Sequence, residues 1–123
     1  MLARHIVWIL AVSGAITAGG GLAAFLNPHL FLRLGFGIDR PESASLFFVR
    51  HWGVLILTVG ALIAYCAYVP SIRTPVLVAG ATEKFAIGIF ALFGPLKRTS
   101  GMNAVAIVDG IFAVLYVVYL AGL

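Results

Sequence analysis

Charged residues are scarce in this sequence of 123 residues, where they make up only 10% of the chain against 63% for apolar residues. A typical soluble domain has roughly 25% charged and about 45–50% apolar residues. A water-soluble fold of this length cannot hide so much apolar surface, so we expect the excess to face lipid. The single cysteine, Cys66, excludes an internal disulfide and any CxxC redox or zinc motif.

Acidic residues are scarcer still, with four against eight basic residues and a formal net charge of +4. The basic residues are scattered beside apolar runs, so nucleic acid is not an expected partner. Among the three histidines only His51 falls within an apolar run, which argues against a bis-histidine haem site. Structural zinc takes four protein ligands. We predict no metal site, and the sequence indicates no particular cofactor.

Long apolar runs are what the sequence has in place of charge. About 20 apolar residues cross a bilayer as a helix, because backbone polar groups in lipid must be paired within the segment. Four runs are long enough, at about residues 6–26, 46–69, 75–95 and 102–123. Asn-Pro, Val-Pro and Gly-Pro pairs follow the first three. We therefore predict an all-α, integral membrane four-helix bundle in a single transmembrane domain, residues 1–123.

The only long loop covers about residues 27–45 and begins with NPHLFLRLGFG. Apolar residues such as Phe31 and Phe36 dominate this stretch, and the cation Arg33 interrupts them. This pattern is typical of a short interfacial segment that lies on the lipid headgroups. The alternative is a lid over a cavity.

Basic residues gather on one side of the predicted bundle. The first loop contains Arg33 and Arg40, with Arg50 just beyond it, and the third loop contains Lys97 and Arg98. The opposite side has only Arg4 and Arg73. The positive-inside rule therefore favours a cytoplasmic position for the first and third loops, with both termini outside. Dual topology stays open as the alternative.

The predicted spans contain five acidic or basic residues: Arg50, His51, Glu83, Lys84 and Asp109. A charge at the bilayer centre costs roughly 2.5–3.5 kcal/mol, so such side chains usually face the bundle interior and pair. Glu83 and Lys84 are adjacent and so lie about 100° apart on a helix, and they cannot both face one partner. A formally neutral set results if Glu83 pairs with Arg50 and Lys84 pairs with Asp109.

Two interpretations of these charges stay open. The first is a structural polar network that fixes helix register. The second is a site for a ligand, a proton or a substrate, which is the usual role of ionisable residues within a membrane. The candidate ligand-binding residues are Arg50, His51, Trp52, Glu83, Lys84 and Asp109, and the candidate catalytic residues are Glu83 and Asp109.

Small residues form a second pattern within the spans. The first run contains Ser13, Gly14, Thr17, Ala18 and the triplet Gly19-Gly20-Gly21, the second contains Gly60 and Ala64, and the third contains Gly80 and Gly88. Such residues let helices approach closely, so we predict close packing at these positions. For the triplet, the alternative is a loosened helix end near a cavity.

Three stretches carry a family resemblance: LNPHLFLRLGFG after the first run, FFVRHWGVLILTVGALI at the second, and VAIVDGIFAVLYVVYL in the fourth. They resemble the small bacterial four-helix membrane proteins called DoxX-like. The resemblance implies an integral membrane protein, with some relatives linked to quinone-dependent redox complexes. It singles out Arg50, Gly53 and Asp109 and implies no catalytic mechanism. The Glu83-Lys84 pair is not part of that pattern.

Three functions follow from these observations. The leading one is a non-enzymatic accessory or ligand-binding module for a lipid-like or quinone-like molecule, because no catalytic constellation is complete. The second is a membrane-embedded isomerase or cyclase that uses Glu83 and Asp109 as acid and base. The third is a small proton-coupled transporter or channel. The expected partners are membrane lipids, a hydrophobic small molecule and further copies of the chain or a membrane complex, in the bacterial inner membrane.

Overall fold

The computed structural model describes residues 2–123, and it is helical throughout except for short connections. The elements are α1 (Leu2–Leu26), α2 (Pro28–Phe36), α3 (Ser43–Cys66), the 3-10 helix η1 (Pro70–Ile72), α4 (Arg73–Phe93) and α5 (Ser100–Leu120). Four helices, α1, α3, α4 and α5, are long and apolar enough to cross a membrane. The predicted all-α membrane fold with four spanning helices is therefore confirmed, and the helix ends lie within about one turn of those predicted.

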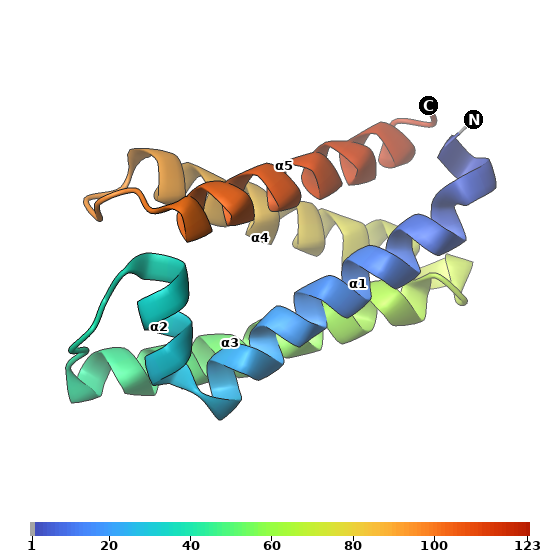
Figure 1. The fold of residues 1–123 in the computed structure, drawn as a ribbon. Helices are drawn as coiled ribbons and strands as arrows, with labels where there is room; N and C mark the ends of the chain where they lie inside the picture. Colours follow the sequence, from blue (N-terminus) through green and yellow to red (C-terminus); the bar gives the residue numbers. More distant parts are fainter. Residues whose placement is uncertain (1) are drawn as a thin grey trace.

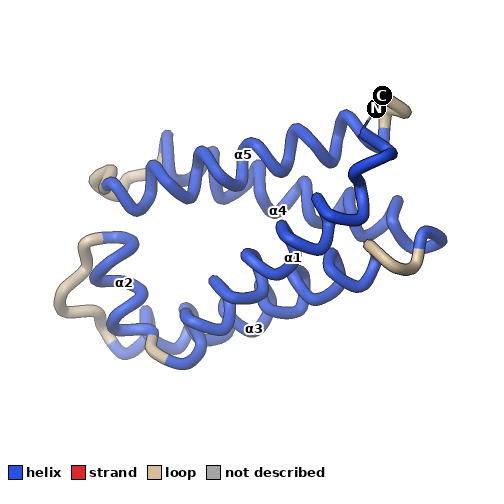
Figure 2. Tube along the Cα trace, turned by 45° about the vertical axis from the view of Figure 1, so that its right-hand side comes forward, coloured by secondary structure: helices blue, strands red, loops and turns tan. Residues whose placement is uncertain are grey.

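The four long helices form two pairs (Figure 1). Helix α1 packs along α3, and α4 packs along α5, whereas contacts between the two pairs are few. We call these the α1–α3 pair and the α4–α5 pair. They lie close together near the two chain termini and separate toward the opposite end, where α2 lies between them (Figures 1 and 2). Helix α2 contacts α1, α3 and α5, so it connects both pairs at that end.

Glycines hold α1 and α3 together at backbone distance. A Cβ atom added at Gly60 would lie 2.7 Å from the Gly14 carbonyl oxygen, and one at Gly53 would lie 2.7 Å from that of Gly21. Real Cβ atoms do not approach that closely, so a side chain at either position would force the helices apart. Close packing is thus confirmed at Gly14, Gly21 and Gly60.

The prediction of close packing is wrong for three of the small residues. A Cβ atom at Gly19, Gly20 or Gly88 would meet nothing within 4 Å. The reason is helical geometry, because adjacent residues are about 100° apart and only one member of the triplet can face α3. Gly21 is that member.

The main apolar core lies at the end where the two pairs meet. It combines Ala67, the residue after α3, with buried residues from all four long helices: Ile6, Leu10, Ile63, Cys66, Leu77, Ala81 and Tyr116. Many large apolar side chains elsewhere stay exposed, among them Trp8, Phe90 and Phe93. An outer surface of this kind is typical of a protein whose surroundings are lipid.

Helix α2 is fixed at both of its ends. The Asn27 side chain accepts a hydrogen bond from the Leu30 N–H at 3.2 Å, and Gly37 closes the helix in the left-handed conformation (φ 70°). The Thr99 hydroxyl, at the start of α5, donates to the Gly35 carbonyl oxygen at 2.7 Å. The predicted loop at 27–45 therefore contains a helix that is tied to the α4–α5 pair.

Candidate functional site: a cavity between the two helix pairs

Lys84 connects the two helix pairs from the interior of the protein. Its side chain is only 1% exposed, and its ammonium group donates to the Asp109 carboxylate at 2.8 Å and to the Thr17 hydroxyl at 2.7 Å. The same ammonium lies 5.8 Å from the centre of the Phe112 ring. Three helices thus meet at one cation, and the predicted pairing of Lys84 with Asp109 is present.

A second polar contact joins the pairs nearer the chain termini. The Tyr116 hydroxyl donates to the Ser13 hydroxyl oxygen at 2.5 Å, and the Ser13 hydroxyl reaches the Leu10 carbonyl oxygen at 3.4 Å. Ser13 and Thr17 lie about one turn apart on α1, so both hydroxyls face the α4–α5 pair, Ser13 toward α5 and Thr17 toward α4. Polar contacts therefore fix how the two pairs sit against each other.

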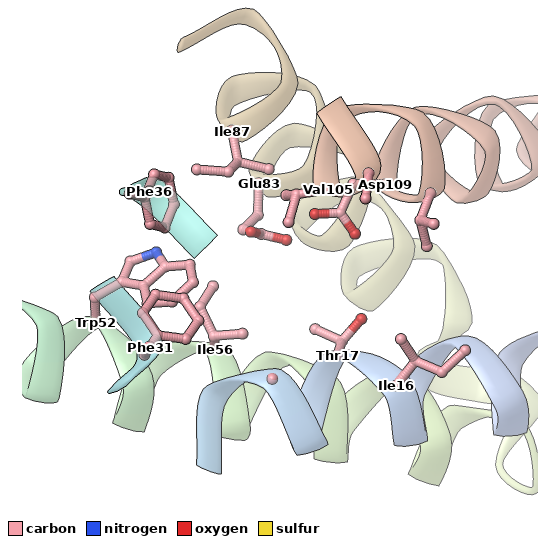
Figure 3. Close-up of a pocket in the computed structure, with 13 residues that line it drawn as sticks. Ile16, Thr17, Phe31, Phe36, Trp52, Ile56, Glu83, Ile87, Val105 and Asp109 are labelled. Carbon is pink, nitrogen blue, oxygen red and sulfur yellow. The ribbon is translucent and has the colours of Figure 1, made fainter. Parts of the chain in front are cut away.

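A cavity of about 270 Å³ opens between the pairs beside the Lys84–Asp109 ion pair. Its lining is predominantly apolar and comes from all five α-helices: Ile16, Thr17, Gly20, Phe31, Phe36, Trp52, Ile56, Glu83, Ile87, Ala104, Val105, Val108 and Asp109 (Figure 3). Binding sites for small molecules in proteins have this composition, with mostly apolar walls and few polar groups.

Two carboxylates face the cavity. Figure 3 shows the Glu83 and Asp109 side chains pointing into it from α4 and α5. Asp109 already accepts a hydrogen bond from Lys84, but the Oε2 atom of Glu83 is buried without a hydrogen-bond partner within residues 2–123. A buried acceptor without a partner is costly, and it usually indicates an absent partner such as water or a ligand.

Aromatic rings form the end of the cavity nearest α2. The Phe31 ring centre lies 5.4 Å from that of Trp52 and 5.7 Å from that of Phe36. Phe31 and Phe36 belong to α2, so this short helix covers one end of the cavity (Figure 3). The position agrees with the lid alternative for the long loop.

The structure separates the predicted site residues into two groups. Trp52, Glu83 and Asp109 line the cavity, with Lys84 directly behind Asp109. Arg50 and His51 are exposed and line a different groove. The predicted pairing of Glu83 with Arg50 is therefore wrong. Residues two apart on a helix point in nearly opposite directions, so a Trp52 that faces inward leaves Arg50 facing outward.

Sequence reasoning missed the roles of the hydroxyl groups on α1. Ser13 and Thr17 were expected only to allow close helix packing, yet both form hydrogen bonds with the other helix pair. The available signal was their spacing of four residues on one face of an apolar helix, where a hydroxyl needs a partner.

Comparisons with known proteins supply no further guidance. No family model, no curated protein and no solved structure matches this chain. The DoxX-like resemblance therefore stays a prediction. Within residues 2–123, no three histidine, cysteine, aspartate or glutamate side chains lie close enough together to hold a metal ion.

Proposed function

We propose that this chain is a non-enzymatic membrane module that binds a lipid-soluble small molecule between its two helix pairs. The observation that carries the proposal is the apolar cavity with the buried Glu83 Oε2 atom on its wall, which has no hydrogen-bond partner among the residues that the structure describes. Its volume of about 270 Å³ lies just below the roughly 300–1,000 Å³ range of small-molecule sites. Such a space suits a ring or headgroup whose tail continues into the bilayer.

Charge and hydrogen bonding define the polar part of this ligand. Glu83 and Asp109 lie on the cavity wall, and Lys84 lies behind Asp109. Their formal charges of −1, −1 and +1 sum to −1. A hydrogen-bond donor or a cation on the ligand complements this charge and satisfies Glu83. A quinol carries hydroxyl donors and fits this requirement.

The aromatic end of the cavity supports a ring-containing ligand. Phe31, Phe36 and Trp52 present ring surfaces on which a planar molecule can stack. We propose that the protein holds this ligand for a membrane complex in the bacterial cytoplasmic membrane, as an accessory subunit or as an assembly of identical copies. The absence of a complete catalytic constellation from the sequence supports a binding role.

Two adjacent glycines provide a matched test. Gly20 lines the cavity and Gly19 does not, although both have open space at the Cβ position. Gly20→Leu should fill the cavity, while Gly19→Leu places the same side chain outside it. We would purify wild type and both variants in mild detergent and record native mass spectra and absorption scans. The expected result is a co-purified small molecule in wild type and Gly19→Leu that is absent from Gly20→Leu.

Three outcomes would reject the proposal. Wild type that carries no small molecule and takes up no added ubiquinol-type probe would leave the cavity without a ligand of this class. Equal retention by Gly20→Leu would place the ligand elsewhere on the protein. Equal loss in Gly19→Leu would show that retention follows helix packing rather than cavity volume.

A second candidate function is the isomerase or cyclase, because both carboxylates face one cavity. Two carboxyl groups at one site can serve as general acid and general base. The test compares the molecules that wild type and Glu83→Gln retain. An enzyme arrested at its substrate should carry a molecule of different structure from that on wild type. Retention of the same molecule by both proteins would reject the enzymatic role.

A further inference from the structure

A second groove, which we call the outer groove, lies along the α1–α3 pair and shares no lining residue with the cavity. This groove of about 510 Å³ is lined by Phe25 from α1 and by Ser43, Leu46, Phe47, Arg50, His51 and Val54 from α3. Its polar lining is basic or hydroxylic, and no carboxylate belongs to it. Arg50 and His51 are both exposed and form no ion pair or side-chain hydrogen bond with residues 2–123.

The position of Arg50 along α3 matters because this helix is long enough to span a bilayer. Helix α3 has 24 residues and a length of about 36 Å, compared with about 30 Å for the hydrocarbon core. Arg50 lies about 10 Å from the start of the helix at Ser43. Its backbone thus lies just inside the apolar region, where an unpaired guanidinium is unfavourable.

The direction of the side chain resolves this difficulty. Side chains on a helix lean toward its N-terminus, so Arg50 reaches toward the Ser43 end and the lipid headgroups. The group it meets there in a membrane is a lipid phosphate, which guanidinium binds through two parallel hydrogen bonds. His51 and the Ser43 hydroxyl supply further donors in the same groove. Phe25, Phe47 and Val54 offer apolar surface for the acyl chains.

We propose that this groove binds one anionic phospholipid, with its phosphate on Arg50 and His51. Charge decides between anionic and zwitterionic lipids. A choline or ethanolamine headgroup carries a cation that finds no carboxylate in the groove, whereas a glycerol headgroup carries none. This lipid site is separate from the cavity and does not depend on the ligand proposed there.

The test measures lipid binding to the full chain in detergent by native mass spectrometry. Phosphatidylglycerol and phosphatidylcholine with identical acyl chains are titrated into wild type, Arg50→Gln, Arg50→Lys and Arg98→Gln. Arg98 is exposed in the loop before α5 and lies outside the groove, so Arg98→Gln removes the same charge elsewhere. We expect wild type to prefer phosphatidylglycerol, and Arg50→Gln to lose roughly tenfold in affinity for it.

The lysine and control variants separate a specific lipid site from diffuse charge attraction. Arg50→Lys should retain part of the preference, because lysine keeps the charge but not the paired hydrogen bonds. Equal losses in Arg98→Gln and Arg50→Gln would indicate diffuse attraction and overturn the site. Equal displacement of phosphatidylglycerol by inorganic phosphate would overturn it as a lipid site, because the groove would then recognise phosphate without the acyl chains. A change of oligomeric state in Arg50→Gln with lipid affinity unchanged would instead assign the groove to a second copy of the chain.

Discussion

At the residue scale, Lys84 is the most informative side chain in the protein. A lysine that is 1% exposed in an apolar bundle needs partners, and Asp109 and Thr17 supply them at hydrogen-bond distance. Glu83, its neighbour in sequence, has one buried oxygen atom with no such partner in the part of the chain from Leu2 onward. The adjacent charges therefore play different parts, since Lys84 joins the helix pairs while Glu83 faces the cavity.

The Lys84–Asp109 ion pair gives a prediction about stability. Lys84→Met should lower the free energy of unfolding by about 3 kcal/mol, because it leaves the Asp109 carboxylate without its cation. The double variant Lys84→Met/Asp109→Leu should lose less than the sum of the two single variants, because neither partner is left charged and unpaired. Unfolding in mixed detergent and SDS micelles, followed by circular dichroism, measures these energies.

Thr82→Val serves as the control for this series. Thr82 is exposed on the same helix and, among residues 2–123, its hydroxyl bonds only to the Val78 carbonyl oxygen. We expect Thr82→Val to change the free energy of unfolding by no more than about 0.5 kcal/mol. If the loss of unfolding free energy in the double variant equals the sum of the losses in the two single variants, Lys84 and Asp109 are not energetically coupled.

At the element scale, the α1–α3 pair is held by backbone contact and the α4–α5 pair by ordinary side-chain packing. Gly14, Gly21, Gly53 and Gly60 all face an opposing backbone, whereas Gly88 and Gly110 have open space. In lipid no hydrophobic force drives helices together, so close backbone packing is a major source of helix association. The two pairs should therefore respond differently to small increases in side-chain volume.

Gly60→Ala and Gly88→Ala test this difference with the same change. Gly60→Ala should destabilise the protein by roughly 1–3 kcal/mol, because the new methyl group meets the α1 backbone. Gly88→Ala should be neutral or stabilising by up to about 1 kcal/mol, because alanine favours helix and the space is open. The same unfolding assay measures both. Similar losses in the two variants would argue against tight α1–α3 packing.

The end of α3 depends on a residue from another element. Arg73, the first residue of α4, donates to the carbonyl oxygens of Cys66 at 2.9 Å and Ala67 at 2.6 Å. It also donates to the Tyr119 hydroxyl oxygen on α5 at 3.3 Å. These bonds satisfy carbonyl groups that a helix end leaves without partners. Arg73 thus joins α3, α4 and α5 at the end nearest the termini.

Replacing Arg73 should therefore loosen this end of the bundle. We expect Arg73→Gln to lower the free energy of unfolding by about 1.5–3 kcal/mol, because it removes hydrogen bonds from a charged group. Tyr119→Phe removes only the hydrogen bond from Arg73 to the Tyr119 hydroxyl, so it should lower the free energy of unfolding by about 0.5–1.5 kcal/mol. Hydrogen exchange at residues 64–68 measures the local effect. Unchanged protection there in Arg73→Gln would show that the carbonyl bonds do not hold the helix end.

At the scale of the whole molecule, orientation and the position of the cavity are linked. Helix α2, which covers one end of the cavity, lies toward the end that carries the first and third loops. The termini lie at the other end (Figures 1 and 2). The positive-inside rule places the more basic end in the cytoplasm. We therefore expect helix α2 and the proposed lipid groove to face the cytoplasmic leaflet.

Cysteine labelling tests this orientation. The single native cysteine, Cys66, is buried and should react slowly. Ser71→Cys introduces a thiol at the terminal end, and Ser100→Cys introduces one at the loop end, both at exposed positions. A membrane-impermeant maleimide should label Ser71→Cys in intact cells and Ser100→Cys only after lysis. The reverse labelling pattern would indicate the opposite topology, with the first and third loops outside. Labelling of both variants in intact cells would indicate dual topology.

The sequence by itself determined that the protein is a helical membrane bundle. Composition and run length suffice for this, because lipid leaves an apolar chain of this length only the helix as a way to pair its backbone groups. The sequence also indicated that buried charges need partners, and the Lys84–Asp109 pair was among the predicted pairings. These conclusions depend on local or average properties of the chain.

Only the tertiary structure decided which charges share a site. A helix can rotate about its own axis without any change in hydropathy, and one residue of rotation error moves a side chain by about 100°. That rotation placed Trp52 in the cavity and Arg50 in the outer groove. It also selected Gly21 rather than Gly20 for contact with α3 and left Gly20 at the cavity wall. Helix rotation follows from packing between distant segments, which the pattern along a single apolar helix does not contain.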